Sequence, residues 1–166
     1  ATLPKPDREV SLPDAADSRK RFEASAVELL SARYKSQSAA LKSRLEAEGE
    51  APALLNQRGI LEAQHGRQGE AERMFKKALE LNRGHAGALN NLGSLAYQAG
   101  RFPEALGFMK RAASSDPDDG AIVLNMARVA VKLGDGGQAQ AFAAKAVALD
   151  GRLKEAAKDI LERKEP

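Results

Sequence analysis

The stretch Gly87–Leu106, GALNNLGSLAYQAGRFPEAL, decides the fold of this chain, because a close copy of it stands 34 residues earlier. The earlier copy, Ala53–Glu72, reads ALLNQRGILEAQHGRQGEAE. When residues 52–85 are aligned on residues 86–119, leucines, asparagines, glycines and alanines coincide at fixed places. A constant period of this length indicates a repeat architecture, in which each unit is one supersecondary element.

A third, more divergent copy occupies residues 120–153. It keeps the small and apolar positions of the second copy: Asn125, Ala130, Gly134, Ala139, Phe142 and Ala146 stand where Asn91, Ala96, Gly100, Ala105, Phe108 and Ala112 stand one period earlier. The sequence therefore predicts three successive units, at residues 52–85, 86–119 and 120–153.

The middle unit shows how each copy divides into two helices. Leu89, Leu92 and Leu95 fall on one stripe of a first helix. We expect Gly100 to end that helix in the left-handed conformation and Pro103 to stand in the first turn of the second helix. Small residues recur where the two helices should cross. Such a pair cannot bury its apolar face alone, so consecutive pairs must stack.

A helix-turn-helix unit with this length and spacing resembles the tetratricopeptide repeat (TPR) family. The resemblance rests on Leu-x-x-x-Gly at 55–59, Leu-x-x-Leu-Gly at 89–93, the turn glycines, the alanine columns and Asp116-Pro117. It implies an all-α fold, an α-solenoid in which TPR units form a right-handed superhelix, closed by a capping helix at residues 153–164. It also implies a non-catalytic scaffold or adaptor that binds a partner protein or an extended peptide in a concave groove.

The composition agrees with this fold and argues against nucleic-acid binding, catalysis and metal binding. Aromatic residues make up 4% of the chain, and 26 basic against 23 acidic residues leave a net charge of +3 without a nucleic-acid footprint. There is no cysteine, and no catalytic or metal-binding motif surrounds His65 or His85. The glycine-rich 134–138 and the acidic 116–119 are interpreted as turn and capping segments. We therefore expect no enzymatic activity, no cofactor and no metal.

Two segments precede the repeat domain, which is expected to span residues 51–166. Residues 1–17 hold three prolines and no apolar period, which predicts a disordered or extended tether. Residues 18–50 predict a helical segment, either one long helix or two short ones broken near residues 35–38. Its apolar stripe comprises Phe22, Leu29, Leu30, Leu41 and Leu45. An alternative function is therefore structural self-association through this segment.

The sequence leaves the compartment open. No apolar run approaches the ~18 residues that indicate a membrane-spanning helix. Ala1 in place of Met is typical of a trimmed or processed chain. The cytoplasm and the periplasm are both compatible with these features.

Polar side chains on the first helices recur at the repeat period and are the candidate peptide-binding residues. An amide side chain offers both donors and an acceptor, so a row of Asn and Gln can pair with peptide main chain of any sequence. The candidates are Asn56, Gln57, Asn90, Asn91, Tyr97, Gln98, Asn125, Arg128 and Lys132. The alternative is that Asn is simply frequent beside the small residue of such repeats. Of the residues with which some family members clamp a C-terminal carboxylate, only Asn91 has its counterpart, so no such clamp is expected.

Overall fold

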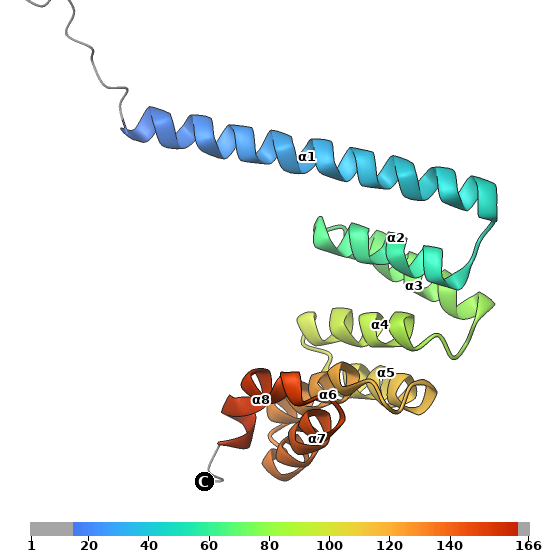
Figure 1. Ribbon diagram of the computed structural model, residues 1–166, viewed down its shortest axis with the longest axis vertical. Coiled ribbons are helices and arrows are strands. Elements are labelled where there is room, and N and C mark those ends of the chain that lie inside the picture. Colours follow the sequence, from blue (N-terminus) through green and yellow to red (C-terminus); the bar gives the residue numbers. More distant parts are fainter. Residues whose placement is uncertain (1–14, 163–166) are drawn as a thin grey trace, which may run out of the picture. The chain divides into compact units, whose positions relative to one another are not determined.

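The computed structural model describes residues 15–162, and all regular elements within that range are helical (Figure 1). Most of the predicted tether and the end of the predicted capping helix lie outside these residues. The chain divides into two units, Ala1–Gln37 and Ser38–Pro166. The helices are α1 (Ala15–Glu48), α2 (Pro52–Gln64), α3 (Gln68–Leu81), α4 (Ala86–Gln98), α5 (Phe102–Ser115), α6 (Gly120–Leu133), α7 (Gly136–Leu149) and α8 (Lys154–Leu161), with a 3-10 turn at Gly151–Leu153.

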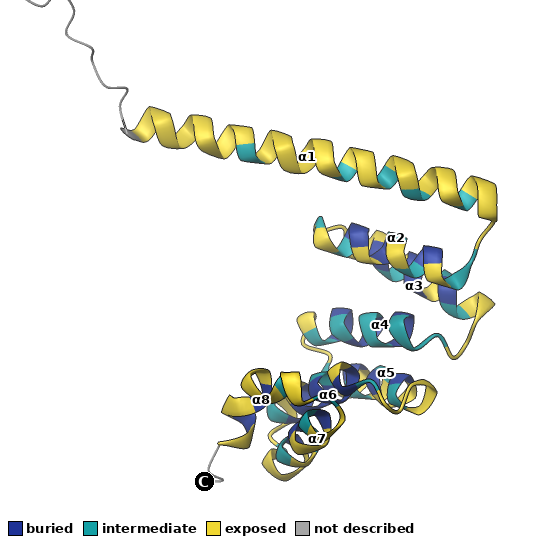
Figure 2. Ribbon diagram, in the orientation of Figure 1, coloured by how far each residue is buried: buried dark blue, intermediate teal, exposed yellow. Residues whose placement is uncertain are grey.

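The predicted repeats are three helical hairpins that stack in chain order. Helix α2 packs on α3, α4 on α5 and α6 on α7, while α3 contacts α4 and α5 contacts α6. The second unit is therefore an α-solenoid, as the sequence period predicts. Figure 2 shows the buried residues of these helices on the faces where neighbouring helices meet.

The turn inside each hairpin is made by the glycine that the sequence predicts. Gly66, Gly100 and Gly134 have φ of 74°, 75° and 78°, in the left-handed region that favours glycine. Pro103 lies in the first turn of α5. Asp135 follows Gly134 and caps α7, with its side chain accepting a hydrogen bond from the backbone N–H of Gln138 at 2.9 Å. The glycine-rich segment therefore ends one helix and begins the next.

The two helices of a hairpin cross where one of them lacks a side chain. A Cβ placed on Gly93 would lie 2.8 Å from Met109 Cγ and 3.1 Å from the carbonyl oxygen of Ala105. In the first hairpin the corresponding space of Gly59 is filled by the ring of Phe75, which is 1% exposed. Glycine at these two positions is therefore a packing requirement.

The third hairpin solves the same crossing with different residues. Ala127 and Ala143 stand at the positions of Gly93 and Met109 one period later, and both are fully buried in one apolar cluster. Alanine replaces glycine on the first helix of this hairpin, and alanine replaces methionine on the second helix. The third hairpin thus has two small side chains at the crossing, whereas the other two have glycine against a large side chain.

The C-terminal end of the solenoid is covered by α8. Ala157 and Ile160 are buried in the cluster that also contains Val123 of α6 and Ala143 of α7. Other side chains of α8, such as Lys158, face the solvent. The apolar side of α8 thus covers the apolar face of the last repeat, and its polar side faces the solvent.

Residues 15–48 form a single helix, α1, without a break at residues 35–38. It begins three residues before the predicted start and ends at Glu48, where Gly49 has φ of 78°. Ala32 stands one period before the turn glycine Gly66. Alanine disfavours the left-handed conformation that makes the hairpin turns, so the helix continues through this position. In the second unit, Leu45 packs against the core cluster that contains Phe75.

Candidate functional site

The first helices of neighbouring hairpins lie side by side along one face of the solenoid. Helix α2 approaches α4, and α4 approaches α6. Over residues 15–162, the second helices α3, α5 and α7 show no comparable approach to one another. Because the first helices are closer together, the stack curves toward them. They therefore line its inner face, where the candidate residues were predicted.

Asparagine side chains join the first helices in diagonal pairs. Asn91 Nδ2 donates to Asn56 Oδ1 at 2.9 Å, and Asn125 Nδ2 donates to Asn90 Oδ1 at 3.1 Å. Each pair spans 35 residues, one more than the repeat period. Asn91 therefore pairs with Asn56, whereas Gln57 is the residue one period before it.

The sequence analysis predicts that these amides hydrogen-bond to a bound peptide, and the pairs use part of their hydrogen-bonding capacity within the protein. An amide has two N–H donors and an oxygen with two lone pairs. The oxygens of Asn56 and Asn90 each accept one bond inside the protein, and Asn91 and Asn125 each donate one. The row thus joins neighbouring repeats through one hydrogen bond per pair, which uses only part of the capacity of each amide.

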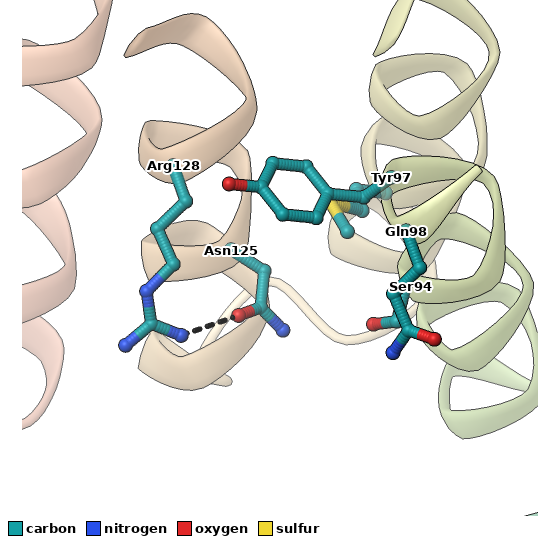
Figure 3. A pocket seen from close by; sticks show the side chains of 6 residues that line it. Ser94, Tyr97, Gln98, Asn125 and Arg128 are labelled. Carbon is teal, nitrogen blue, oxygen red and sulfur yellow. Dashed lines mark hydrogen bonds between the residues drawn. The ribbon is translucent and has the colours of Figure 1, made fainter. Parts of the chain in front are cut away.

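A hollow of about 220 Å³ opens on the inner face between α4 and α6 (Figure 3). Its lining residues come from three helices: Ser94, Tyr97 and Gln98 from α4, Met109 from α5, and Asn125 and Arg128 from α6. Figure 3 shows Tyr97 extending from α4 toward α6, with its hydroxyl on the side of Arg128. The hollow combines an aromatic ring, a buried thioether and several polar groups, which is the mixture typical of a ligand site.

Hydrogen bonds and ring packing hold the walls of the hollow in place. Arg128 Nη1 donates to Asn125 Oδ1 at 3.0 Å, which connects the guanidinium to the asparagine row. The Tyr97 ring packs edge-to-face on Phe102, with 5.5 Å between ring centroids. Both contacts restrict side chains that a ligand would otherwise have to order, so binding would cost less conformational entropy.

The inner face is positively charged at α6. Arg128 and Lys132 are both exposed, and neither pairs with a carboxylate within residues 15–162. By contrast, Glu62 on α2 lies between Arg58 Nε at 3.0 Å and Arg67 Nη1 at 3.7 Å, and its side chain is 4% exposed. Arg128 and Lys132, which lack a carboxylate partner within residues 15–162, thus lie at the α6 end of the asparagine row.

Of the other predicted residues, Gln57 and Lys132 lie outside the hollow, whereas Gln98 lines it and also bonds to α3. Gln57 Oε1 is 3.5 Å from Arg44 Nη1 of α1, and Gln98 Oε1 accepts from Gln68 Nε2 at 3.1 Å. Lys132 is exposed one turn beyond Arg128 and does not line the hollow.

Three residues of this region were missed by the sequence reasoning. Ser94 lies one period before Arg128, so the repeat alignment carried a signal for it. Met109 is a buried core residue that also lines the hollow. The buried Glu62 had no signal, since its two neighbours in the repeat alignment are alanines.

Comparisons with known proteins agree with this geometry. Two models of the tetratricopeptide repeat match, one at residues 56–120 and one at residues 96–163. The chain belongs to the tetratricopeptide repeat family. No curated protein sequence matches the chain significantly.

Solved structures of other helical proteins share the fold. PilF of Pseudomonas aeruginosa superposes with a TM-score of 0.70 at 18% identity, over 88% of this chain and 67% of that one. MamA gives a TM-score of 0.67 at 19% identity, over 90% and 82%. PcrH from Pseudomonas aeruginosa gives 0.62 at 23% identity, over 67% and 89%.

Family membership makes the chain a protein–protein interaction module, of a family that generally serves as a non-catalytic scaffold. Among residues 15–162, no helix has the length and apolar character needed to cross a membrane. In the same range, no group of His, Cys, Asp and Glu side chains is arranged to hold a metal ion.

Proposed function

We propose that the inner face formed by α2, α4 and α6 binds an extended peptide segment of a partner protein, with one side chain of the peptide in the hollow between α4 and α6. The observation that carries the proposal is the hollow itself. It places Tyr97, Asn125 and Arg128 together on the face where the asparagine row runs.

The asparagine row suits an extended main chain. Each peptide unit of a ligand presents one N–H and one C=O, and both need partners when water is displaced. Asn91 keeps one N–H and its oxygen, and Asn56 keeps both N–H groups after the bond between them is counted. The row can therefore pair with the backbone of a peptide, while the hollow selects a side chain.

The charge at α6 favours an acidic residue in the partner. Arg128 presents a planar fork of donors, of which Nη1 already bonds to Asn125. A carboxylate near Arg128 and Lys132 would gain charge-assisted hydrogen bonds, worth ~1.5–3 kcal/mol each when partly buried. We expect bound peptides to carry Asp or Glu beside an apolar or aromatic residue.

A peptide selection tests this proposal. Random peptides displayed on phage would be selected against the wild-type protein, and the winners measured by isothermal titration calorimetry. The variant Arg128→Ala/Lys132→Ala removes the two cations of the inner face. The control Lys110→Ala/Lys145→Ala removes two exposed cations from the second helices α5 and α7, with the same change in net charge.

The expected result is enrichment of acidic peptides whose affinity falls at least about tenfold, or ~1.4 kcal/mol, in the inner-face variant and stays unchanged in the control. Equal losses in both variants would mean that binding follows net charge alone. Absence of any enriched peptide, with circular dichroism showing a folded protein, would contradict peptide binding.

A further inference from the structure

The hollow between α4 and α6 has room for an aromatic ring. Its volume is about 220 Å³, whereas an apolar cavity of about 150 Å³ in another protein already binds benzene. Figure 3 shows side chains of α4, among them Tyr97, on one side of this space and Asn125 and Arg128 of α6 on the other. A ring can therefore enter between the two helices without displacing either of them.

The hollow also lies away from the asparagine row, so only a long side chain reaches it. In the proposed function, on which this inference rests, the peptide main chain follows that row. On α4, Ser94 and Tyr97 follow Asn90 of the row by four and seven residues, or ~6 and ~10 Å at ~1.5 Å per residue. The side chain of Ala, Ser or Val ends too close to the main chain to fill a space at this distance.

The floor of the hollow is a thioether that is fixed in place. Met109 is 2% exposed and lies in an apolar cluster with Ala105 and Met126. Its Cγ and its methyl carbon lie against Gly93 of α4, only 2.8 Å and 3.2 Å from where a Cβ on that glycine would stand. Sulfur makes favourable contacts with the edge of an aromatic ring. The floor therefore favours a ring over the aliphatic side chain of Leu or Ile.

The walls of the hollow discriminate in the same direction. The Arg128 guanidinium is held by Asn125 at 3.0 Å, at a place where it can lie over a bound ring. The Tyr97 ring, itself packed on Phe102, offers an edge-to-face partner. The side chains of Lys and Arg are also long, but their charge would be repelled by Arg128 and Lys132. An aromatic side chain is thus favoured by the floor and the walls together.

We propose that the hollow is the anchor site for an aromatic side chain, Phe, Tyr or Trp, of the bound peptide, and that Met109, Tyr97 and Arg128 determine this specificity. One period earlier, Phe75, Ala63 and Ser94 stand in their places. The corresponding positions between α2 and α4 therefore lack the thioether, the tyrosine ring and the guanidinium. The anchor site is specific to α4 and α6, and the rest of the peptide is held through its main chain and its acidic residue.

Calorimetry with a matched pair of peptides tests the anchor. The probes are the tightest acidic peptide from the phage selection and a copy in which Leu replaces its enriched aromatic residue. We expect the Leu copy to bind the wild-type protein at least about tenfold more weakly, because the contacts of the ring with the thioether and the guanidinium are lost. Acidic peptides without an enriched aromatic residue, or equal affinities of the two peptides, would overturn the anchor and leave the proposed function in place. If no peptide is enriched, the proposed function itself is contradicted, and the anchor falls with it.

A variant that fills the hollow gives a second test. Ser94→Ile adds volume to its wall, and isoleucine is the residue that stands there one period earlier, as Ile60. The control Ser114→Ile makes the same change at an exposed position of α5. Both hydroxyls donate at 3.0 Å to the carbonyl four residues earlier, so the two variants lose the same hydrogen bond.

The two variants should differ in how they distinguish the peptides. In Ser94→Ile the affinities of the aromatic peptide and its Leu copy should come within about twofold of each other, whereas Ser114→Ile should keep the wild-type difference. Circular dichroism would verify that both variants are folded. A tenfold preference for the aromatic peptide that persists in Ser94→Ile would overturn the anchor site.

The methyl signal of Met109 reports on the ring in the wild-type protein, without any variant. The chain has three methionines, and Met74, which packs in a different cluster, serves as the internal reference. At saturation the aromatic peptide should shift the Met109 methyl proton signal through the ring current, and the Leu copy should shift it far less. A Met109 signal that stays in place when the aromatic peptide is bound would contradict the proposed anchor.

Discussion

Whether Gly59→Ala stabilises or destabilises the protein depends on one packing contact, at the crossing of the first hairpin. Replacing Gly by Ala inside a helix stabilises it by ~1 kcal/mol when nothing else changes. At Gly59 the new Cβ would lie 2.6 Å and 2.9 Å from two atoms of the Phe75 ring, well inside the ~3.5–4.0 Å of an ordinary carbon contact. The ring is 1% exposed and has no open side into which it can retreat.

The magnitude follows from the two opposing terms. Forcing an extra methyl into a packed core costs typically ~1–3 kcal/mol, and this clash is at the severe end. After the helix gain is subtracted, Gly59→Ala should lower the free energy of unfolding by about 1–2 kcal/mol. Gly107 of α5 is the matched control, since a Cβ there meets no atom within 4 Å. Gly107→Ala should raise that free energy by ~0.5–1 kcal/mol.

Urea-induced unfolding followed by far-UV circular dichroism gives both values. The midpoint should fall for Gly59→Ala and rise for Gly107→Ala. Two rises would refute the claim that Gly59 is required for helix packing. A double-mutant cycle with Phe75→Ala sharpens the test. Because Phe75→Ala removes the ring, adding Gly59→Ala to that variant should lower the free energy of unfolding only slightly. The interaction energy between the two substitutions should then be ~1 kcal/mol or more.

Three further predictions concern single side chains. His85 Nδ1 accepts from a backbone N–H in the first turn of α4, so His85→Ala should cost ~1 kcal/mol in urea unfolding, and His85→Asn much less. Glu62→Gln removes a buried charge from Arg58 and should lower the urea midpoint, whereas the exposed Glu155→Gln should not. The hydrogen bond from the Arg152 side chain, and then that from its backbone N–H, lower the pKa of Asp150. The contribution of ionised Asp150 to the stability of the fold is present above the unfolded-state pKa and is lost as the pH falls through the folded-state pKa. Because Arg152→Ala removes the side-chain hydrogen bond, it should raise the Asp150 pKa measured by NMR titration.

The sequence predicted the fold because the repeat signal is carried by residues with strict local roles. A glycine with positive φ at Gly66, Gly100 and Gly134 has few substitutes, and small residues at the crossings are required by packing. These constraints recur at every period and so survive divergence elsewhere. The single helix α1 follows from the same logic, since the glycine is missing where a turn would be.

The repeat period placed the candidate residues on the first helices but did not give their hydrogen-bond partners. The period identified the face, yet it aligned Asn91 with Gln57, whereas the hydrogen bond goes to Asn56. Side chains on adjacent helices meet diagonally, and that offset depends on the angle between helices rather than on the repeat length. The hollow also required Met109, whose role as floor depends on how far α4 and α6 separate.

The most direct test of peptide binding on the inner face is chemical-shift mapping with an acidic peptide from the selection. Backbone amide signals of the labelled protein would be recorded with and without the peptide. The account predicts that the largest changes fall on α4 and α6, around Tyr97, Asn125 and Arg128. Changes concentrated on the second helices α3, α5 and α7 would contradict it.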